Sequence, residues 1–188
     1  MYHYIFKTSA LIGRGFLFIC TMRKKILFSG ILSMIVLLAL RWQGAAFYSS
    51  QYPMGIIDFE LMHNLKDAKM MIDIVGKRTM QLNVTIDFVF IICYSLFFFF
   101  CCKALMDQFH FRYLKTIGFI FLELSVLIGI LDLIENIALL ITLGGYGSDV
   151  SVLISKWAAI CKFSLAALVV IYIITASVMV QIISKKKV

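Results

Sequence analysis

The sequence predicts an all-α integral membrane protein, a bundle of four transmembrane helices with an outer amphipathic helix between the first and second. Three observations carry this prediction. Hydrophobic residues make up 62% of the 188 residues and only one proline is present. The mean hydropathy is +0.98, which lies outside the range of soluble globular proteins. Four apolar stretches are separated by polar segments and flanked by basic clusters, the pattern of a polytopic membrane protein.

The predicted spans are residues 26–42, 84–106, 116–143 and 157–183. An α-helix needs about 20 apolar residues to cross roughly 30 Å of hydrocarbon. The last three stretches meet this length, but the uninterrupted apolar part of the first, residues 26–40, is short. Because basic residues 23–25 precede it, this segment could instead be a cleavable signal peptide. Arg41 and Trp42 resemble an interfacial anchor more than a cleavage region, so we expect a retained helix.

The chain divides into an N-terminal lead-in (1–25), one membrane domain (26–183) and a basic tail (184–188). Met22 begins a second basic-then-apolar segment, so translation could start at Met1 or at Met22. Basic clusters precede the first span, join the second to the third, and follow the fourth. By the positive-inside rule both termini are expected to be cytoplasmic, in a multi-pass protein of the cell (plasma or cytoplasmic) membrane. These clusters account for the net charge of +8, so no nucleic-acid partner is expected.

The segment between the first two spans predicts an outer helix over residues 58–75. Its apolar residues recur at spacings of four, three, four and three, which is one helix face: Leu61, Leu65, Ala68, Ile72 and Val75. Asp58 is placed as an N-cap or first-turn acid and Gly76 as a C-terminal stop. Such a helix would lie against the bundle or along the bilayer surface. Its candidate lid residues are Glu60, His63 and Asp67.

The third span contains the sequence DLIEN, residues 132–136, which places two carboxylates and an amide inside an apolar run. At 100° per residue, Ser125, Gly129, Asp132 and Asn136 fall within about 60° of one another, and Glu135 flanks them. Small and polar residues in one stripe indicate contact with other helices. A charge facing lipid would cost about 2.5–3.5 kcal/mol, so the stripe should face the bundle interior.

Polar residues from all four spans are predicted to converge in the outer half of the membrane. Asp87 lies about one turn below the outer surface, and Tyr94 shares its helix face. Lys162 follows Trp157 by less than two turns. The complete predicted cluster is Arg41, Asp87, Tyr94, Asp132, Glu135, Asn136 and Lys162. Within it, Asp132 is expected to pair with Lys162, and Asp87 with Arg41.

This cluster has a structural and a functional interpretation. It could consist of interhelical ion pairs that fix helix register, or it could line an outward-facing polar cavity. The leading functional prediction is a non-enzymatic binding or accessory subunit for a lipid, an ion or a partner protein. One alternative is an enzyme that acts on lipid-linked substrates by acid–base chemistry, with Asp132 and Glu135 as candidate catalytic residues. Another is a proton-coupled transporter that works as an oligomer. Expected partners are membrane lipids and a membrane protein or second copy.

Other motifs are weaker. Glu60 and His63 have the E-x-x-H spacing of di-metal bundles, but no second such pair exists, so neither a metal nor another cofactor is expected. The five cysteines include no C-x-x-C, which argues against redox chemistry. Glu123 lies on the opposite side of its helix from Asp132, in the cytoplasmic half. We expect it to be protonated or paired with Lys103.

Overall fold

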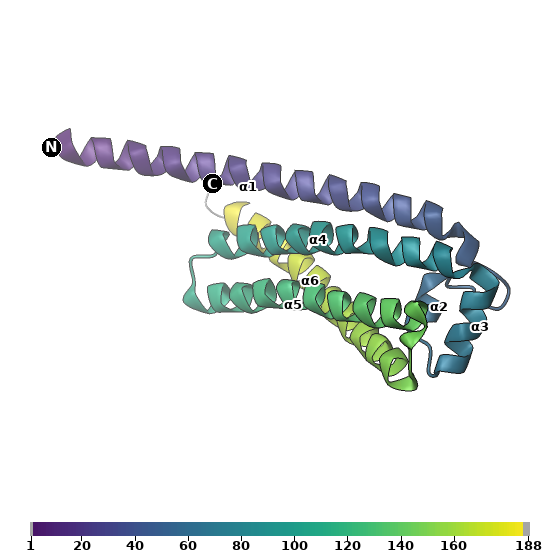
Figure 1. Ribbon diagram of the computed structural model, residues 1–188. Helices are drawn as coiled ribbons and strands as arrows, with labels where there is room; N and C mark the ends of the chain where they lie inside the picture. The colour runs from purple at the N-terminus through teal and green to yellow at the C-terminus, as the bar shows by residue number, and fades with distance from the viewer. Residues whose placement is uncertain (1, 186–188) are drawn as a thin grey trace.

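The chain forms a bundle of long helices closed at one end by a shorter helical segment. The computed structural model describes the backbone of residues 2–185 and the side chains of residues 22–182. Between residues 2 and 185 the fold is helical, without strands. The long helices are α1 (Tyr2–Gln43), α4 (Lys77–Gln108), α5 (Arg112–Ile141) and α6 (Asp149–Lys185) (Figure 1). The basic tail predicted at 184–188 lies outside the described side chains.

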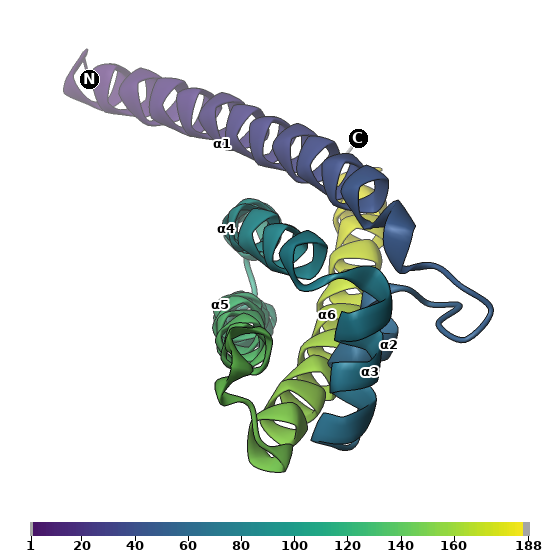
Figure 2. The ribbon, with the colours of Figure 1, turned by 45° about the vertical axis from the view of Figure 1, so that its right-hand side comes forward.

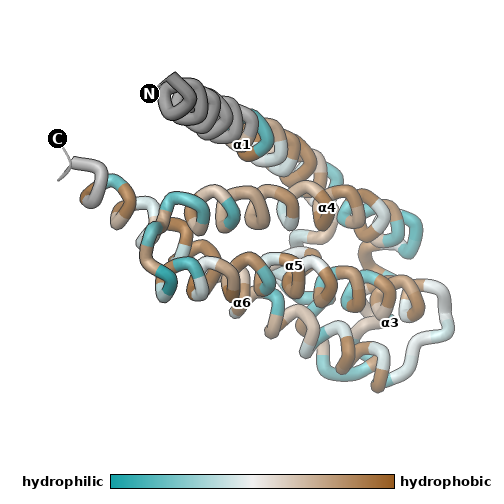
Figure 3. The backbone as a smooth tube through the Cα atoms, turned by 90° about the vertical axis from the view of Figure 1, so that its left-hand side faces the viewer, coloured by the Kyte–Doolittle hydropathy of each residue, from teal (hydrophilic) through white to brown (hydrophobic). Residues whose placement is uncertain are grey.

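Four helical segments of the described chain are long and apolar enough to cross a membrane: Met22–Phe47, Lys77–Gln108, Arg112–Tyr146 and Asp149–Ile182. This confirms the predicted all-α class and the number of candidate spans, by length and composition. Large apolar side chains also cover the outside of the bundle. Ile92, Phe119 and Ile171, for example, are more than half exposed. Long hydrophobic stretches follow α4, α5 and α6 along most of their length (Figure 3).

The segment between α1 and α4, residues 44–76, closes one end of the bundle and is called the strap here. It contains the short 3₁₀ helix η1 (Gly44–Phe47), α2 (Ile56–Glu60) and α3 (Leu65–Val75). The single helix expected over 58–75 is therefore interrupted. Asn64 is extended and its side chain accepts a hydrogen bond from the Asp67 N–H at 2.9 Å, so it caps a new helix.

Two glycines set the bounds of these short helices. Gly55, with φ 67°, precedes α2, and Asp58 lies in the first turn of α2, where Oδ2 accepts from the Met54 N–H at 2.8 Å. Gly76, with φ 92°, ends α3 as predicted and starts α4. Only glycine adopts this backbone region without strain. Asp149 fastens the other end of α3, because its Oδ1 accepts from the Leu65 N–H at 2.7 Å.

The long helices do not pack as a closed square. α4 lies between α1 and α5, and α5 packs along α6. Figure 2 shows α1 beside α4 and away from α5. Among the described residues α1 and α6 make no extended contact with each other. The strap spans the region between them, and its Phe47, Phe59 and Met71 join an apolar core with Met80 of α4.

A turn after α5 brings the chain back toward the strap. It includes the π-helical stretch η2 (Thr142–Tyr146), which Gly145 breaks with φ 94°. α6 then begins next to the strap, where its first residue, Asp149, bonds to Leu65 of α3. α4 and α5 approach closely at Gly129, because a Cβ on this residue would lie 2.5 Å from Ser95 Oγ. This contact sets the depth and rotation of the polar residues that follow Gly129 on α5.

Candidate functional site

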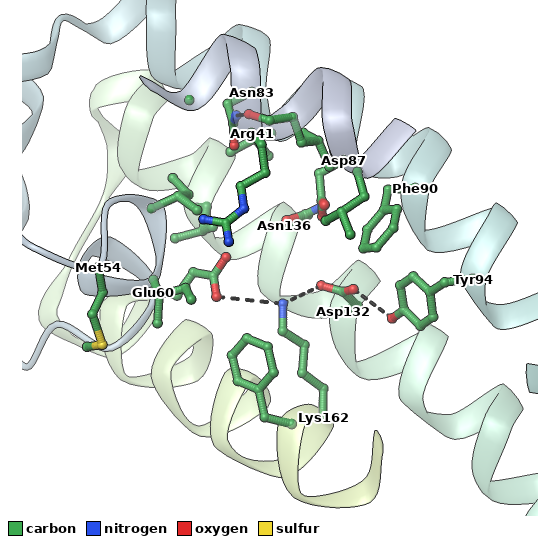
Figure 4. Close-up of a pocket in the computed structure, with 18 of the residues that line it drawn as sticks. Arg41, Met54, Glu60, Asn83, Asp87, Phe90, Tyr94, Asp132, Asn136 and Lys162 are labelled. Carbon is green, nitrogen blue, oxygen red and sulfur yellow. Dashed lines mark hydrogen bonds and ion pairs between the residues drawn. The ribbon is translucent and has the colours of Figure 1, made fainter. Parts of the chain in front are cut away.

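Lys162 of α6 is the centre of a buried ionic cluster. Its Nζ donates to Asp132 Oδ1 at 2.6 Å and to Glu135 at 2.9 Å, both on α5. Glu60 of α2 approaches from the strap, with Oε2 3.8 Å from the same nitrogen. The four residues are 0–9% exposed, and Figure 4 shows Lys162 between Asp132 and Glu60. The cluster contains the Asp132–Lys162 pair expected from the sequence, together with two further carboxylates.

Helical spacing on α5 explains how three polar groups reach two neighbouring helices. Asp132, Glu135 and Asn136 are separated by three and four positions, so they share one face. Tyr94 of α4 donates its hydroxyl to Asp132 Oδ2 at 2.7 Å. Asn136 donates from Nδ2 to Asp87 Oδ2 at 2.7 Å, also on α4. Both oxygens of Asp132 therefore have a donor, whereas the bond recorded for Asp87 comes from a neutral amide.

Arg41 does not form the expected pair with Asp87. Its Nη1 donates to the hydroxyl of Tyr48 at 2.9 Å, in an exposed position. No described carboxylate forms a salt bridge with it. The guanidinium group points toward the side of the cavity where Glu60 lies (Figure 4). Asp87 is bonded instead to Asn136, which is nearer along the α4–α5 contact.

The candidate lid residues separate into two groups. Glu60 is buried in the cluster, but His63 and Asp67 are exposed and do not line the cavity. Asp67 instead accepts from the Asn64 side chain at 2.8 Å. Glu123 is exposed on α5. Lys103 pairs with Asp107 at 3.3 Å, not with Glu123.

Sequence reasoning missed a second polar contact beside the cluster. Asn83 of α4 is 4% exposed and donates to Gln43 Oε1 at 2.5 Å. Gln43 in turn donates to the Thr79 carbonyl at 2.9 Å, which ties the end of α1 to α4. The available signal was that Asn83 lies one turn before Asp87, on the same helix face.

A cavity of about 500 Å³ lies beside the ionic cluster. Its polar part contains Arg41, Glu60, Asn83, Asp87, Asp132, Asn136 and Lys162. Its walls are mainly apolar, and include Leu37, Leu40, Phe47, Phe90, Phe98 and Phe163. Residues of both α1 and α6 line the cavity, although the two helices make no extended contact with each other. The cavity is therefore open sideways between these two helices, with Leu37 38% and Phe163 45% exposed at its margins.

The charges of the cluster are unequal in number. Three carboxylates surround one ammonium group, and Glu60 Oε2 is buried without a hydrogen-bond donor. Burial raises the pKa of Glu60 to about 7; the positive charge of Lys162 opposes this rise, while Asp132 and Asp87 add to it. Glu60 therefore changes charge near neutral pH. Among the described residues, no group of three or more His, Cys, Asp and Glu side chains is placed to hold a metal ion.

No protein-family model, curated protein or solved structure matches this chain.

Proposed function

We propose that this chain is a membrane protein that binds an amphiphilic ligand, a lipid or lipid-like molecule, in the cavity beside Lys162. One observation carries the proposal: the cavity joins extensive apolar walls to a buried polar cluster at one side. Binding sites for small molecules usually combine apolar walls with a few converging polar groups. A ligand with a hydrocarbon tail and a polar head group matches both parts.

The sideways opening between α1 and α6 supports a ligand that enters from the bilayer. Both helices are apolar enough to span a membrane, so the opening would face hydrocarbon. Ion pairs alone could explain the contacts of Lys162, but they leave the adjoining space of about 500 Å³ unexplained. In hydrocarbon, a tail gains little from leaving lipid for an apolar wall. Selectivity would therefore come from the head group at the cluster.

We also propose the orientation in the membrane, with both termini cytoplasmic and the strap on the outer side. The start of α1, the end of α6 and the α4–α5 connection lie at one end of the bundle, and the strap lies at the other (Figure 1). Lys103, Arg112 and Lys115 lie near that connection, as the positive-inside rule requires of a cytoplasmic end. Modification of single introduced cysteines in intact cells tests this: position 63 should react with an impermeant reagent and position 110 should not.

Photolabelling tests the ligand site directly. A dodecyl amphiphile that carries a photoreactive diazirine in its tail is added to the full chain in detergent, and the labelled residues are mapped by mass spectrometry. Labelling should concentrate on Leu37, Leu40 and Phe163. Ala166→Trp should remove most of it, because Ala166 lines the cavity.

Ala167→Trp is the matched control. Ala167 is the next residue of α6, is exposed, and does not line the cavity. Labelling in this variant should equal that of the wild type. Equal labelling of outward-facing residues such as Ile92 and Ile171, or the same pattern in both tryptophan variants, would contradict the proposal.

A further inference from the structure

We propose that the ligand's head group is an organic ammonium ion, a primary amine or a quaternary ammonium, held between Glu60, Asp87 and the surrounding aromatic rings. This inference rests on the proposed function and specifies its ligand class. It concerns the side of the cavity where the strap meets α4. Three features of the cavity support an ammonium ligand: unequal charge, a buried acceptor without a donor, and aromatic walls.

The first feature is charge. Glu60, Asp132 and Glu135 all lie within 4.0 Å of the Lys162 ammonium. Asp87 adds a fourth carboxylate to the same cavity region, with Asn136 as its donor. Buried charges are stable only when they are paired or neutralised. One lysine pairs with Asp132 and Glu135, which leaves Glu60 and Asp87 either to hold a proton or to meet a further positive charge.

The protein's other cation near the cavity does not supply that charge. Arg41 lines the cavity, but its recorded hydrogen bond goes to Tyr48, and among the described side chains it forms no salt bridge. Arg41 is also exposed at the surface of the protein, whereas Glu60 and Asp132 are buried. The cavity near Glu60 and Asp87 thus favours a cationic ligand and disfavours an anionic one.

The second feature is the free acceptor. Glu60 is 9% exposed, and its Oε2 is fully buried without a hydrogen-bond donor. A distance of 3.8 Å to Lys162 Nζ is an ion pair without a hydrogen bond. Leaving such an acceptor unsatisfied is unfavourable. A primary ammonium in the cavity would supply an N–H donor to the Glu60 carboxylate, whereas a quaternary ammonium has no N–H and would supply its positive charge alone.

The third feature is the aromatic lining. Phe90, Tyr94 and Phe98 of α4 face the cavity, and Phe163 of α6 lines it from the other side. Organic ammonium groups bind well to such rings through cation–π interactions. Lys162 Nζ already lies 4.9 Å from the centroid of Phe163. A bare metal ion would need several oxygen ligands at fixed distances, whereas an organic ammonium uses both the rings and the carboxylates.

The test uses four photoreactive dodecyl amphiphiles that differ only in head group: primary ammonium, trimethylammonium, maltoside and sulfate. The full chain is kept in maltoside micelles at a pH of about 8, where Glu60 is mostly ionised. Half-saturating concentrations are read from the labelling of Leu37, Leu40 and Phe163. The two cationic probes should label the cavity at about tenfold lower concentration than the neutral and anionic probes, which corresponds to one charge-assisted contact.

Three variants locate the selectivity. Glu60→Gln and Asp87→Asn should each reduce the preference for cationic probes about tenfold. Glu123→Gln removes an exposed acid outside the cavity and should leave the preference unchanged. Partitioning into micelles is common to all variants, so it cancels in this comparison. Because Glu60 and Asp87 lie on different elements, loss of folding in one variant leaves the other as a test.

The outcomes separate this inference from the proposed function. Equal labelling by all four probes, or preference for sulfate, would overturn the ammonium assignment and leave the amphiphile site in place. Absence of cavity labelling by every probe would overturn both. Competition by phosphatidylethanolamine, but not by ethanolamine or choline, supports a membrane-borne ligand. Equal competition by the small amines would retain the ammonium selectivity and overturn the amphiphile.

Discussion

Asp132 of α5 and Lys162 of α6 form a buried ion pair with 2.6 Å between Oδ1 and Nζ. The two residues are 4% and 7% exposed, so the pair is largely removed from water. Asp132 has a second donor in Tyr94, and Lys162 a second acceptor in Glu135. The pair thereby connects α4, α5 and α6 at one depth of the bundle.

The first prediction concerns the loss of the central charge. Lys162→Met should lower the free energy of unfolding by about 3–5 kcal/mol, because it leaves three buried carboxylates without their common partner. Unfolding in mixed micelles with increasing SDS measures the change. Asp132→Asn should be milder, since Lys162 keeps Glu135. Lys156→Met, a change on the same helix at a residue with no recorded salt bridge, should stay within about 0.5 kcal/mol.

Removing the acids together with the lysine completes this experiment. The triple variant Lys162→Met, Asp132→Asn and Glu135→Gln should recover most of the stability lost in Lys162→Met. An unchanged stability in Lys162→Met alone would contradict the prediction. It would mean that the cluster is maintained at a cost to the fold, as functional sites often are.

Helical periodicity predicted the α5 part of this site correctly. Asp132 and Asn136 are one turn apart, so a single rotation of the helix directs both to the interior, where each has a partner on a neighbouring helix. Lys162 could be placed at a similar depth from its distance to Trp157. These inferences need only the pitch of a helix and the cost of a charge in hydrocarbon.

The strap could not be predicted in the same way. Leu61 and Leu65 keep helical spacing across the break, so their periodicity gives no sign that Asn64 caps a new helix. The approach of Glu60 to Lys162 depends on how this segment folds back over the bundle end, which involves contacts distant in sequence. Arg41 has a long side chain that can reach several acceptors. Its hydrogen bond to Tyr48 likewise depends on how the strap folds, which the sequence pattern does not show.

The second prediction concerns the anchoring of α3. Asp149→Ala removes the acceptor of the Leu65 N–H and should loosen the start of α3 locally. One lost hydrogen bond to a charged group is worth about 1.5–3 kcal/mol, so amide exchange over residues 65–75 should become at least about tenfold faster. Hydrogen exchange with mass spectrometry measures this. Asp73→Ala, at an exposed acid of α3, is the control, and equal exchange in the two variants would contradict the prediction.

The third prediction concerns the close approach of α4 and α5. Gly129→Ala should destabilise the protein by about 1–3 kcal/mol, because the new methyl group would collide with Ser95 Oγ. Ser95→Gly should rescue much of this loss in the double variant. Ser95→Ala alone should be nearly neutral, since Ser95 Oγ is buried without a hydrogen-bond partner. Unfolding in SDS measures the stability of Gly129→Ala, Ser95→Ala and the double variant. If the double variant is as unstable as Gly129→Ala, the collision with Ser95 is not the cause of the loss.

The fourth prediction uses the raised pKa of Glu60. Its pKa is about 7 in the folded protein and 4.5 in a model peptide, so between these values the folded state holds a proton that the unfolded state releases. The contribution of Glu60 to the free energy of unfolding is fully present below a pH of about 4.5 and is lost as the pH rises through about 7. The loss is at most about 3 kcal/mol. Glu60→Gln should remove this part of the pH dependence.

Comparing the two proteins shows what the Glu60 charge contributes, together with its effect on the groups around it. Lys162, Asp132, Glu135 and Asp87 face the same region and are present in both proteins. The difference in unfolding free energy between wild type and Glu60→Gln should therefore change mainly between pH of about 4.5 and 7. A cationic amphiphile in the cavity should move this change to lower pH, because it favours the ionised carboxylate. Parallel pH profiles for the two proteins would show that the Glu60 carboxyl titrates in the folded state as it does in the unfolded chain.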